Sequence, residues 1–201
     1  MTEAAYDLAQ DLYVAKAMAA SLDSYVRQDQ LYYPLGAEFP RMTLGGFLLR
    51  LRRLHSLQAQ LSPTQAHALQ EVDASHARAV ATWRHHYQQK LLTEVNSRQD
   101  VLRYYLAECE EGLGQCRENY PPEAHRRTIL EELQHALVRL GVPGYAAAQD
   151  RLATLDDRLR ALLEDGPFLW PEPLQSVYSA AEYWWLYAQP KPRQARAAAP
   201  R

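Results

Sequence analysis

Two pairs of acidic and histidine residues have the spacing of metal ligands on a helix. Glu132 and His135 match the Glu-x-x-His step of four-helix di-metal carboxylate proteins, in which positions i and i+3 project together into the bundle. Asp73 and His76 have the same spacing and form a weaker counterpart. These four residues are the candidate metal ligands of the chain.

The complete di-metal pattern contains two Glu-x-x-His pairs and two further glutamates. This sequence has one such pair, so Glu94 or Glu108 would have to supply further ligands. One pair arises readily by chance in a helical protein rich in glutamate. A di-metal bundle is therefore the third of the functions that we consider, and we predict no metal or other cofactor.

Residues for covalent or acid–base catalysis do not group along the sequence. His85 and His86 are neighbours, but adjacent side chains on a helix point about 100° apart and cannot act on one atom. The sequence has no glycine-rich phosphate loop after a strand, no Gly-x-Ser-x-Gly elbow and no Cys-x-x-Cys pair. We predict that the protein is not an enzyme.

Arginines gather at a few places and make nucleic-acid binding the second function to consider. Arg50 and Arg53 lie one turn apart on a predicted helix, and the C-terminal tail adds Lys191, Arg193 and Arg196. The formal net charge of −2 excludes a whole-protein attraction to nucleic acid, so binding would need this local patch. The alternative is an ordinary solvated helix face.

Glu94 and Arg98 are polar residues in otherwise apolar rows of a predicted helix. They are four residues apart with the acid first, which is the favourable orientation for an ion pair. One interpretation is a partly solvated pair where the helix leaves the core. The other is a buried polar layer that fixes register or the choice of partner.

The composition is that of an ordinary globular protein. The 201 residues are 47% hydrophobic and 23% charged, and a chain of this length and composition can bury a hydrophobic core.

Signals for secretion and membrane insertion are not seen in the sequence. The first twenty residues lack a signal-peptide pattern, and no stretch approaches the roughly 20 apolar residues of a membrane-spanning helix. Cys109 and Cys116 would lie about 10.5 Å apart along one helix, too far for a disulfide. We predict a cytoplasmic protein with free thiols and no membrane partner.

The spacing of apolar residues predicts an all-α fold. No run of alternating β-branched residues bounded by turns indicates a strand. Six helices are expected in one domain over residues 1–188, at about 2–28, 43–61, 63–111, 122–140, 145–164 and 174–188. A disordered basic tail is expected over 189–201, because it lacks a core pattern.

An eleven-residue repeat dominates the predicted helix 63–111. One of its rows contains Leu69, Val80, Leu91, Leu102 and Leu113. Eleven residues make three turns of a nearly straight helix, so the apolar face does not drift. An unbroken helix would span about 73 Å, more than a compact globule of this size allows.

A break in this helix near Asn96 and Ser97 would restore a compact shape. The apolar phase runs through both residues undisturbed, so we favour an elongated bundle built around one long central helix.

Several residues have the types expected at helix ends. Thr43 is a plausible N-cap, and Ser62 before Pro63 is a favoured helix start. Gly45 and Gly46 in a first turn cost roughly 1 kcal/mol each relative to Ala. Either another helix approaches closely there, or the free N–H groups hold an anion beside Arg41.

Aromatic residues concentrate in a predicted loop and in the predicted last helix, where they could form an interface. We therefore predict a non-enzymatic protein-interaction or assembly subunit that binds a second copy of itself or a larger complex. The candidate partner-binding residues are Tyr32, Tyr33, Glu94, Arg98, Tyr183, Trp184, Trp185 and Tyr187.

Overall fold

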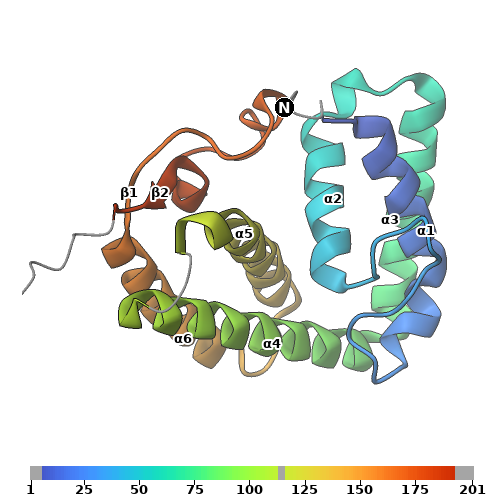
Figure 1. The fold of residues 1–201 in the computed structure, drawn as a ribbon. Helices are drawn as coiled ribbons and strands as arrows, with labels where there is room; N and C mark the ends of the chain where they lie inside the picture. Colours follow the sequence, from blue (N-terminus) through green and yellow to red (C-terminus); the bar gives the residue numbers. More distant parts are fainter. Residues whose placement is uncertain (1–5, 113–115, 193–201) are drawn as a thin grey trace, which may run out of the picture.

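Six α-helices form most of the computed structural model, which describes residues 6–112 and 116–192. They are α1 (Leu8–Val26), α2 (Leu44–Ser56), α3 (Pro63–Thr82), α4 (Arg84–Glu111), α5 (Cys116–Leu140) and α6 (Tyr145–Leu162) (Figure 1). The mostly helical architecture is confirmed. Within these ranges, no helix has the length and apolar character needed to cross a membrane.

Helix α4 connects the two halves of the molecule. In Figure 1 it runs along the lower edge, with α1, α2 and α3 on one side and α5, α6 and the C-terminal segment on the other. It packs against all five other helices. The buried apolar side chains form one cluster that includes residues from every helix.

The predicted helix 63–111 is broken at Trp83, so the expected continuous central helix is wrong. Trp83 has φ −115° and ψ 31°, and α3 and α4 leave it in different directions (Figure 1). Its ring lies under the Arg27 guanidinium, 4.8 Å from the ring centroid. The kink adds no residue to the chain, so the apolar residues keep their eleven-residue spacing in the sequence on both sides of Trp83. Leu69, Leu91 and Leu102 are buried on both sides of the break.

Helix ends follow local sequence signals closely. The Thr43 hydroxyl accepts the Gly46 N–H at 3.0 Å, and Ser62 forms a capping box with Gln65 around Pro63. The predicted first helix starts later than expected, at Leu8, because Asp7 accepts the N–H groups of its first turn. The second helix ends at Ser56, and η1 (Gln58–Gln60) follows it as a short 3₁₀ turn.

Cys109 and Cys116 form a disulfide, so the prediction of free thiols is wrong. Gly112 adopts the left-handed conformation with φ 71° and ends α4. The two cysteines therefore lie on different helices, with Cα atoms 5.5 Å apart, and not two turns apart on one helix. Because the cytoplasmic prediction rested in part on free thiols, the disulfide leaves the compartment open.

Helix α5 starts six residues earlier than the predicted 122–140 and contains Pro121 and Pro122. The predicted start at residue 122 is therefore wrong, because the helix runs through both prolines. The Tyr105 hydroxyl donates to the carbonyl oxygen of Cys116 at 2.8 Å and holds the first turn beside α4.

The predicted last helix 174–188 does not form. The segment contains η2 (Glu172–Leu174), η3 (Trp184–Tyr187) and irregular chain. Its aromatic residues make individual contacts: the Trp185 indole N–H donates to Thr128 Oγ1 at 2.9 Å, and the Tyr183 hydroxyl donates to Glu132 Oε1 at 2.8 Å. The segment is therefore held by separate side-chain contacts with α5, and it does not pack through one buried face of a helix.

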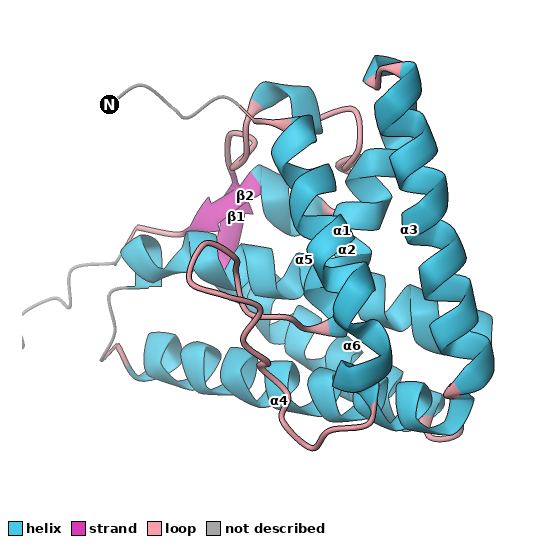
Figure 2. Ribbon diagram, turned by 90° about the vertical axis from the view of Figure 1, so that its right-hand side faces the viewer, coloured by secondary structure: helices cyan, strands magenta, loops and turns pink. Residues whose placement is uncertain are grey.

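A small antiparallel sheet closes the C-terminal segment, contrary to the expectation of no strands. Strand β1 (Leu163–Asp165) pairs with β2 (Ala188–Pro190), with Leu163 opposite Pro190 (Figure 2). Three-residue strands are too short to show alternation in a sequence. The predicted disordered tail thus begins with ordered chain, since the Lys191 N–H also donates to the Leu162 carbonyl oxygen at 3.0 Å.

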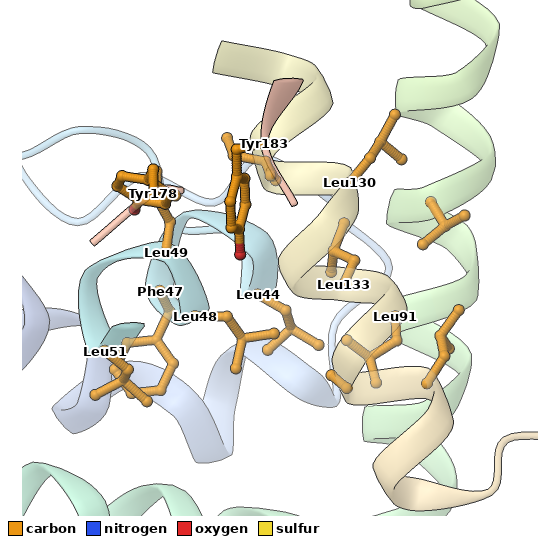
Figure 3. Close-up of a cluster of buried hydrophobic side chains, with 14 of the residues drawn as sticks. Leu44, Phe47, Leu48, Leu49, Leu51, Leu91, Leu130, Leu133, Tyr178 and Tyr183 are labelled. Atoms are coloured by element: carbon orange, nitrogen blue, oxygen red, sulfur yellow. The ribbon is translucent and has the colours of Figure 1, made fainter. Parts of the chain in front are cut away.

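The close-up of the core shows how α2 is held between its neighbours. Leucines of α2 face leucines of α5 and Leu91 of α4, and Tyr178 and Tyr183 of the C-terminal segment cover the same cluster (Figure 3). The C-terminal segment therefore completes the core around α2 and α5.

Candidate ligand-binding cleft

A cleft of about 890 Å³ lies between α2, α3, α4 and α5, and we call it the four-helix cleft. This volume is within the range of small-molecule sites. Its apolar lining includes Leu48, Leu51, Val80 and Leu140. Its polar lining comprises Arg52, His55, Ser56, Asp73, His76, Arg84, Tyr87, Glu132, His135 and Arg139.

All four predicted metal ligands line this cleft, but each has its own partner. Both Asp73 carboxylate oxygens lie 3.0 Å from His55 Nε2. His76 Nε2 hydrogen-bonds to the Tyr87 hydroxyl at 2.8 Å. Glu132 lies 3.5 Å from Arg52 Nε and accepts the Tyr183 hydroxyl. The Asp73/His76 pair and the Glu132/His135 pair therefore do not form the paired-ligand arrangement of a di-metal centre.

Glu94 and Glu108, the proposed further ligands, do not line the cleft. Glu94 is fully buried and pairs with Arg98, whereas Glu108 is exposed on α4.

Two histidines of the cleft have shifted pKa values of opposite sign. Burial and the nearby Arg139 charge lower the pKa of His76 to about 4, against a smaller opposing effect of Asp73. Hydrogen bonds to Glu131 and Glu132 raise the pKa of His135 to about 9. At neutral pH, His76 is uncharged and His135 carries a positive charge.

The cleft carries positive charge that the protein does not neutralise. Arg139 forms no ion pair within residues 6–112 and 116–192, and Arg84 donates to the Leu140 carbonyl oxygen at 3.2 Å. The carboxylates of the lining, Asp73 and Glu132, already pair with His55 and Arg52. An anion entering the cleft would meet Arg84 and Arg139, which form no ion pair with either of the two lining carboxylates.

A second hollow of about 500 Å³ between α4 and α6 also contains arginines. There each arginine has a partner: Arg103 pairs with Asp100, and Arg158 pairs with Glu110 at 2.8 Å. Arg151 donates to Asn96 and Gln99. This hollow therefore offers less uncompensated charge than the four-helix cleft.

The predicted nucleic-acid residues Arg50 and Arg53 do not form an exposed face. Both pair with the buried Asp11, at 3.5 Å and 3.3 Å, and their side chains are 19% and 12% exposed. The Arg53 guanidinium also donates to the Tyr178 hydroxyl. These contacts tie α1, α2 and the C-terminal segment together.

The tail residues predicted to bind nucleic acid lie partly outside the described residues. The Lys191 ammonium donates to the Ala161 carbonyl oxygen at 2.8 Å, whereas Arg193 and Arg196 fall in the range that the structure does not describe.

Glu94 and Arg98 form a buried ion pair with a shortest distance of 2.7 Å, so the pair is not partly solvated; a role in fixing register or partner choice stays a prediction. Arg98 also donates to Thr43 Oγ1 at 3.2 Å, and the Gly45 N–H donates to Glu94 Oε2 at 3.0 Å. The pair therefore joins α4 to the start of α2 within one chain.

The predicted partner-binding aromatics differ in exposure. Tyr183 and Trp185 are buried in the core of this chain, at 0% and 1% exposure. Trp184, Tyr187 and Tyr33 are partly buried, and Tyr32 is exposed. In this structure, only part of the aromatic set is accessible to a partner.

The arginines that give the cleft its charge were missed as site residues. Arg84 and Arg139 lie at the start of α4 and near the end of α5, far apart in the sequence and outside any motif. Their proximity arises from the packing of the helices, and no local sequence signal marks it.

Comparison with known proteins finds no matching family model, no matching curated protein and no matching solved structure.

Proposed function

We propose that the protein is a non-enzymatic binding protein whose four-helix cleft takes an anionic ligand with an apolar body. The observation that carries this proposal is the position of Arg84 and Arg139, without carboxylate partners in the described chain, beside the apolar side chains of Val80 and Leu140. Guanidinium groups bind carboxylates and phosphates through charge-assisted hydrogen bonds. The apolar lining would cover the remainder of the ligand.

His76 gives the cleft an apolar surface beside the two arginines. It is neutral and lies against the Phe47 ring, with centroids 5.2 Å apart, whereas His135 is already paired with Glu131, Glu132 and Glu182. The cleft thus has charged groups and an apolar surface close to each other. A carboxylate or phosphate attached to an aromatic or aliphatic body has the matching chemistry.

The fluorescent probe 8-anilinonaphthalene-1-sulfonate tests the proposal, because it joins an anionic group to an apolar body. We expect one probe to bind per folded chain, with fluorescence that increases on binding. Arg139→Glu should weaken binding about tenfold, equivalent to about 1.4 kcal/mol. Arg84→Glu should act in the same direction.

Arg78→Glu is the matched control. Arg78 lies exposed on α3, outside the cleft lining, and its contact is a hydrogen bond to Ser75. This variant makes the same change in net charge but should keep the affinity of the original protein. If Arg78→Glu and Arg139→Glu change the affinity for the probe equally, or if the folded protein binds no probe, the proposal is wrong.

Protein binding, the leading prediction from the sequence, is the second candidate. Its support is a surface aromatic pair on α1 and the following loop: Tyr13 is 53% exposed and stacks on Phe39, with ring centroids 5.1 Å apart. Such aromatic groups are common at interfaces. Light scattering after size exclusion should give twice 23.0 kDa if a second copy is the partner, and Tyr13→Glu should restore the monomer.

A further inference from the structure

His135 lies between two carboxylates that come from different parts of the chain. Its Nε2 atom is 3.4 Å from Glu131 Oε1 and 3.4 Å from Glu182 Oε1. Glu131 precedes His135 by one turn of α5, whereas Glu182 lies in the C-terminal segment before η3. The three potential ligand atoms all lie within 4.8 Å of one another.

The two distances from His135 Nε2 to the carboxylate oxygens of Glu131 and Glu182 match the edges of a metal coordination tetrahedron. Ligand atoms about 2.0 to 2.1 Å from a zinc ion stand about 3.4 Å apart at the corners of a tetrahedron. We propose that Glu131, His135 and Glu182 bind a divalent cation. One imidazole and two carboxylates, with a fourth position for water, favour Zn²⁺.

Each carboxylate is held by an arginine through its other oxygen. Glu131 Oε2 accepts from Arg127 at 2.7 Å, and Glu182 Oε2 accepts from Arg52 at 3.1 Å. Both Oε1 atoms are thus left facing His135. Ligating carboxylates in metal sites are characteristically fixed by such outer hydrogen bonds.

The imidazole ring also has a carboxylate on its far side. His135 Nδ1 lies 3.9 Å from Glu132 Oε2, and Glu132 Oε1 accepts the Tyr183 hydroxyl at 2.8 Å. Metal-binding histidines commonly direct their second nitrogen at a carboxylate, which fixes the ring orientation. The predicted ligand Glu132 therefore takes a positioning role, and its neighbour Glu131 takes the ligand role.

The local charge suits a divalent cation. Four carboxylates (Glu131, Glu132, Glu182 and Asp156) and two guanidinium groups (Arg52 and Arg127) take part in the connected ion pairs. With a neutral imidazole, the sum is two negative charges.

Isothermal titration of the full-length, chelator-treated protein with zinc chloride tests this site. We expect one Zn²⁺ per chain, and a tetrahedral visible absorption spectrum when Co²⁺ replaces it. His135→Ala and Glu182→Gln should each weaken zinc binding at least about tenfold. Glu182 has a side chain that is 40% exposed, so its variant should fold normally.

His67→Ala is the matched control, because His67 also lies one turn from a glutamate. Its Nε2 is 3.7 Å from Glu71, both side chains are more than half exposed, and no third ligand group lies with them in the described part of the chain. This variant should bind zinc like the original protein. Absence of zinc binding, or binding that both His135→Ala and Glu182→Gln leave unchanged, would overturn the proposal.

This inference goes beyond the proposed anion binding. The titration with 8-anilinonaphthalene-1-sulfonate remains interpretable whichever result the zinc titration gives.

Discussion

The backbone N–H of Gly45 donates to the Glu94 carboxylate at 3.0 Å, which fixes the first turn of α2 against the middle of α4. A helix start attracts negative charge because its N–H groups are unpaired and the helix dipole is positive there. The two explanations offered for Gly45 and Gly46 thus combine at Gly45: a neighbouring helix approaches closely, and it brings the anion. Arg98, not Arg41, balances the charge.

Gly45→Ala should destabilise the fold by about 2 kcal/mol. A Cβ atom there would lie 2.3 Å from Ile129 Cγ2 and 2.7 Å from Glu94 Oε1, so α5 or α4 must move. Gly46→Ala is the matched control, since its nearest contact is Thr43 Oγ1 at 3.1 Å, and it should be neutral or stabilising by up to about 1 kcal/mol. Urea unfolding followed by circular dichroism measures both, and equal effects would contradict the close approach at Gly45.

Trp185→Ala should reduce the free energy of unfolding by about 4 kcal/mol. The side chain is fully buried, donates to Thr128, and lies under the Arg127 guanidinium at 3.8 Å. Trp184→Ala should cost about 1 kcal/mol, because that ring is only partly buried and has the Arg160 guanidinium 3.7 Å from its centroid. If both variants melt like the original protein, the C-terminal segment is not part of the core.

Acid should destabilise the protein partly through His76. Its pKa is about 4 in the folded state and near 6.5 when unfolded, so the unfolded chain binds more protons between these values. Stability from this group is full above pH 6.5 and falls by about 3 kcal/mol as the pH drops to about 4. His76→Gln should flatten the dependence of unfolding free energy on pH in this window, as measured by urea unfolding at several pH values.

Reduction of the Cys109–Cys116 disulfide should lower the free energy of unfolding by about 2 kcal/mol, the value expected for a loop this short. Cys109→Ser with Cys116→Ser should reproduce the effect without reductant. Alkylation of the unfolded protein followed by mass spectrometry should label no thiol before reduction and two after it. Two labels before reduction would show that the disulfide does not form.

The sequence predicted those parts of the fold that depend on local patterns. Thr43, Ser62 and Pro63 act at helix starts as expected, because a cap is formed by residues within one turn. The kink at Trp83 was missed because it leaves the apolar spacing intact. The disulfide was missed because both cysteines were treated as lying on one helix, although the predicted helix ended at residue 111, before Cys116.

The cleft was only partly predictable. Asp73, His76, Glu132 and His135 were selected for helix spacing and do line it, but the pattern could not show their separate partners. Glu182 joins His135 through an irregular segment that the sequence presented as a helix. When two site residues meet only because distant segments pack together, no local pattern in the sequence marks them.

The most direct test of the proposed function is to locate the bound anionic probe by NMR. Amide spectra of the 23.0 kDa protein, recorded during titration with 8-anilinonaphthalene-1-sulfonate, should shift at residues lining the four-helix cleft, including Arg84 and Arg139. The same titration of Arg139→Glu should need about tenfold more probe. Shifts confined to the hollow between α4 and α6, around Arg103 and Arg158, would contradict the assignment of the ligand site to the four-helix cleft.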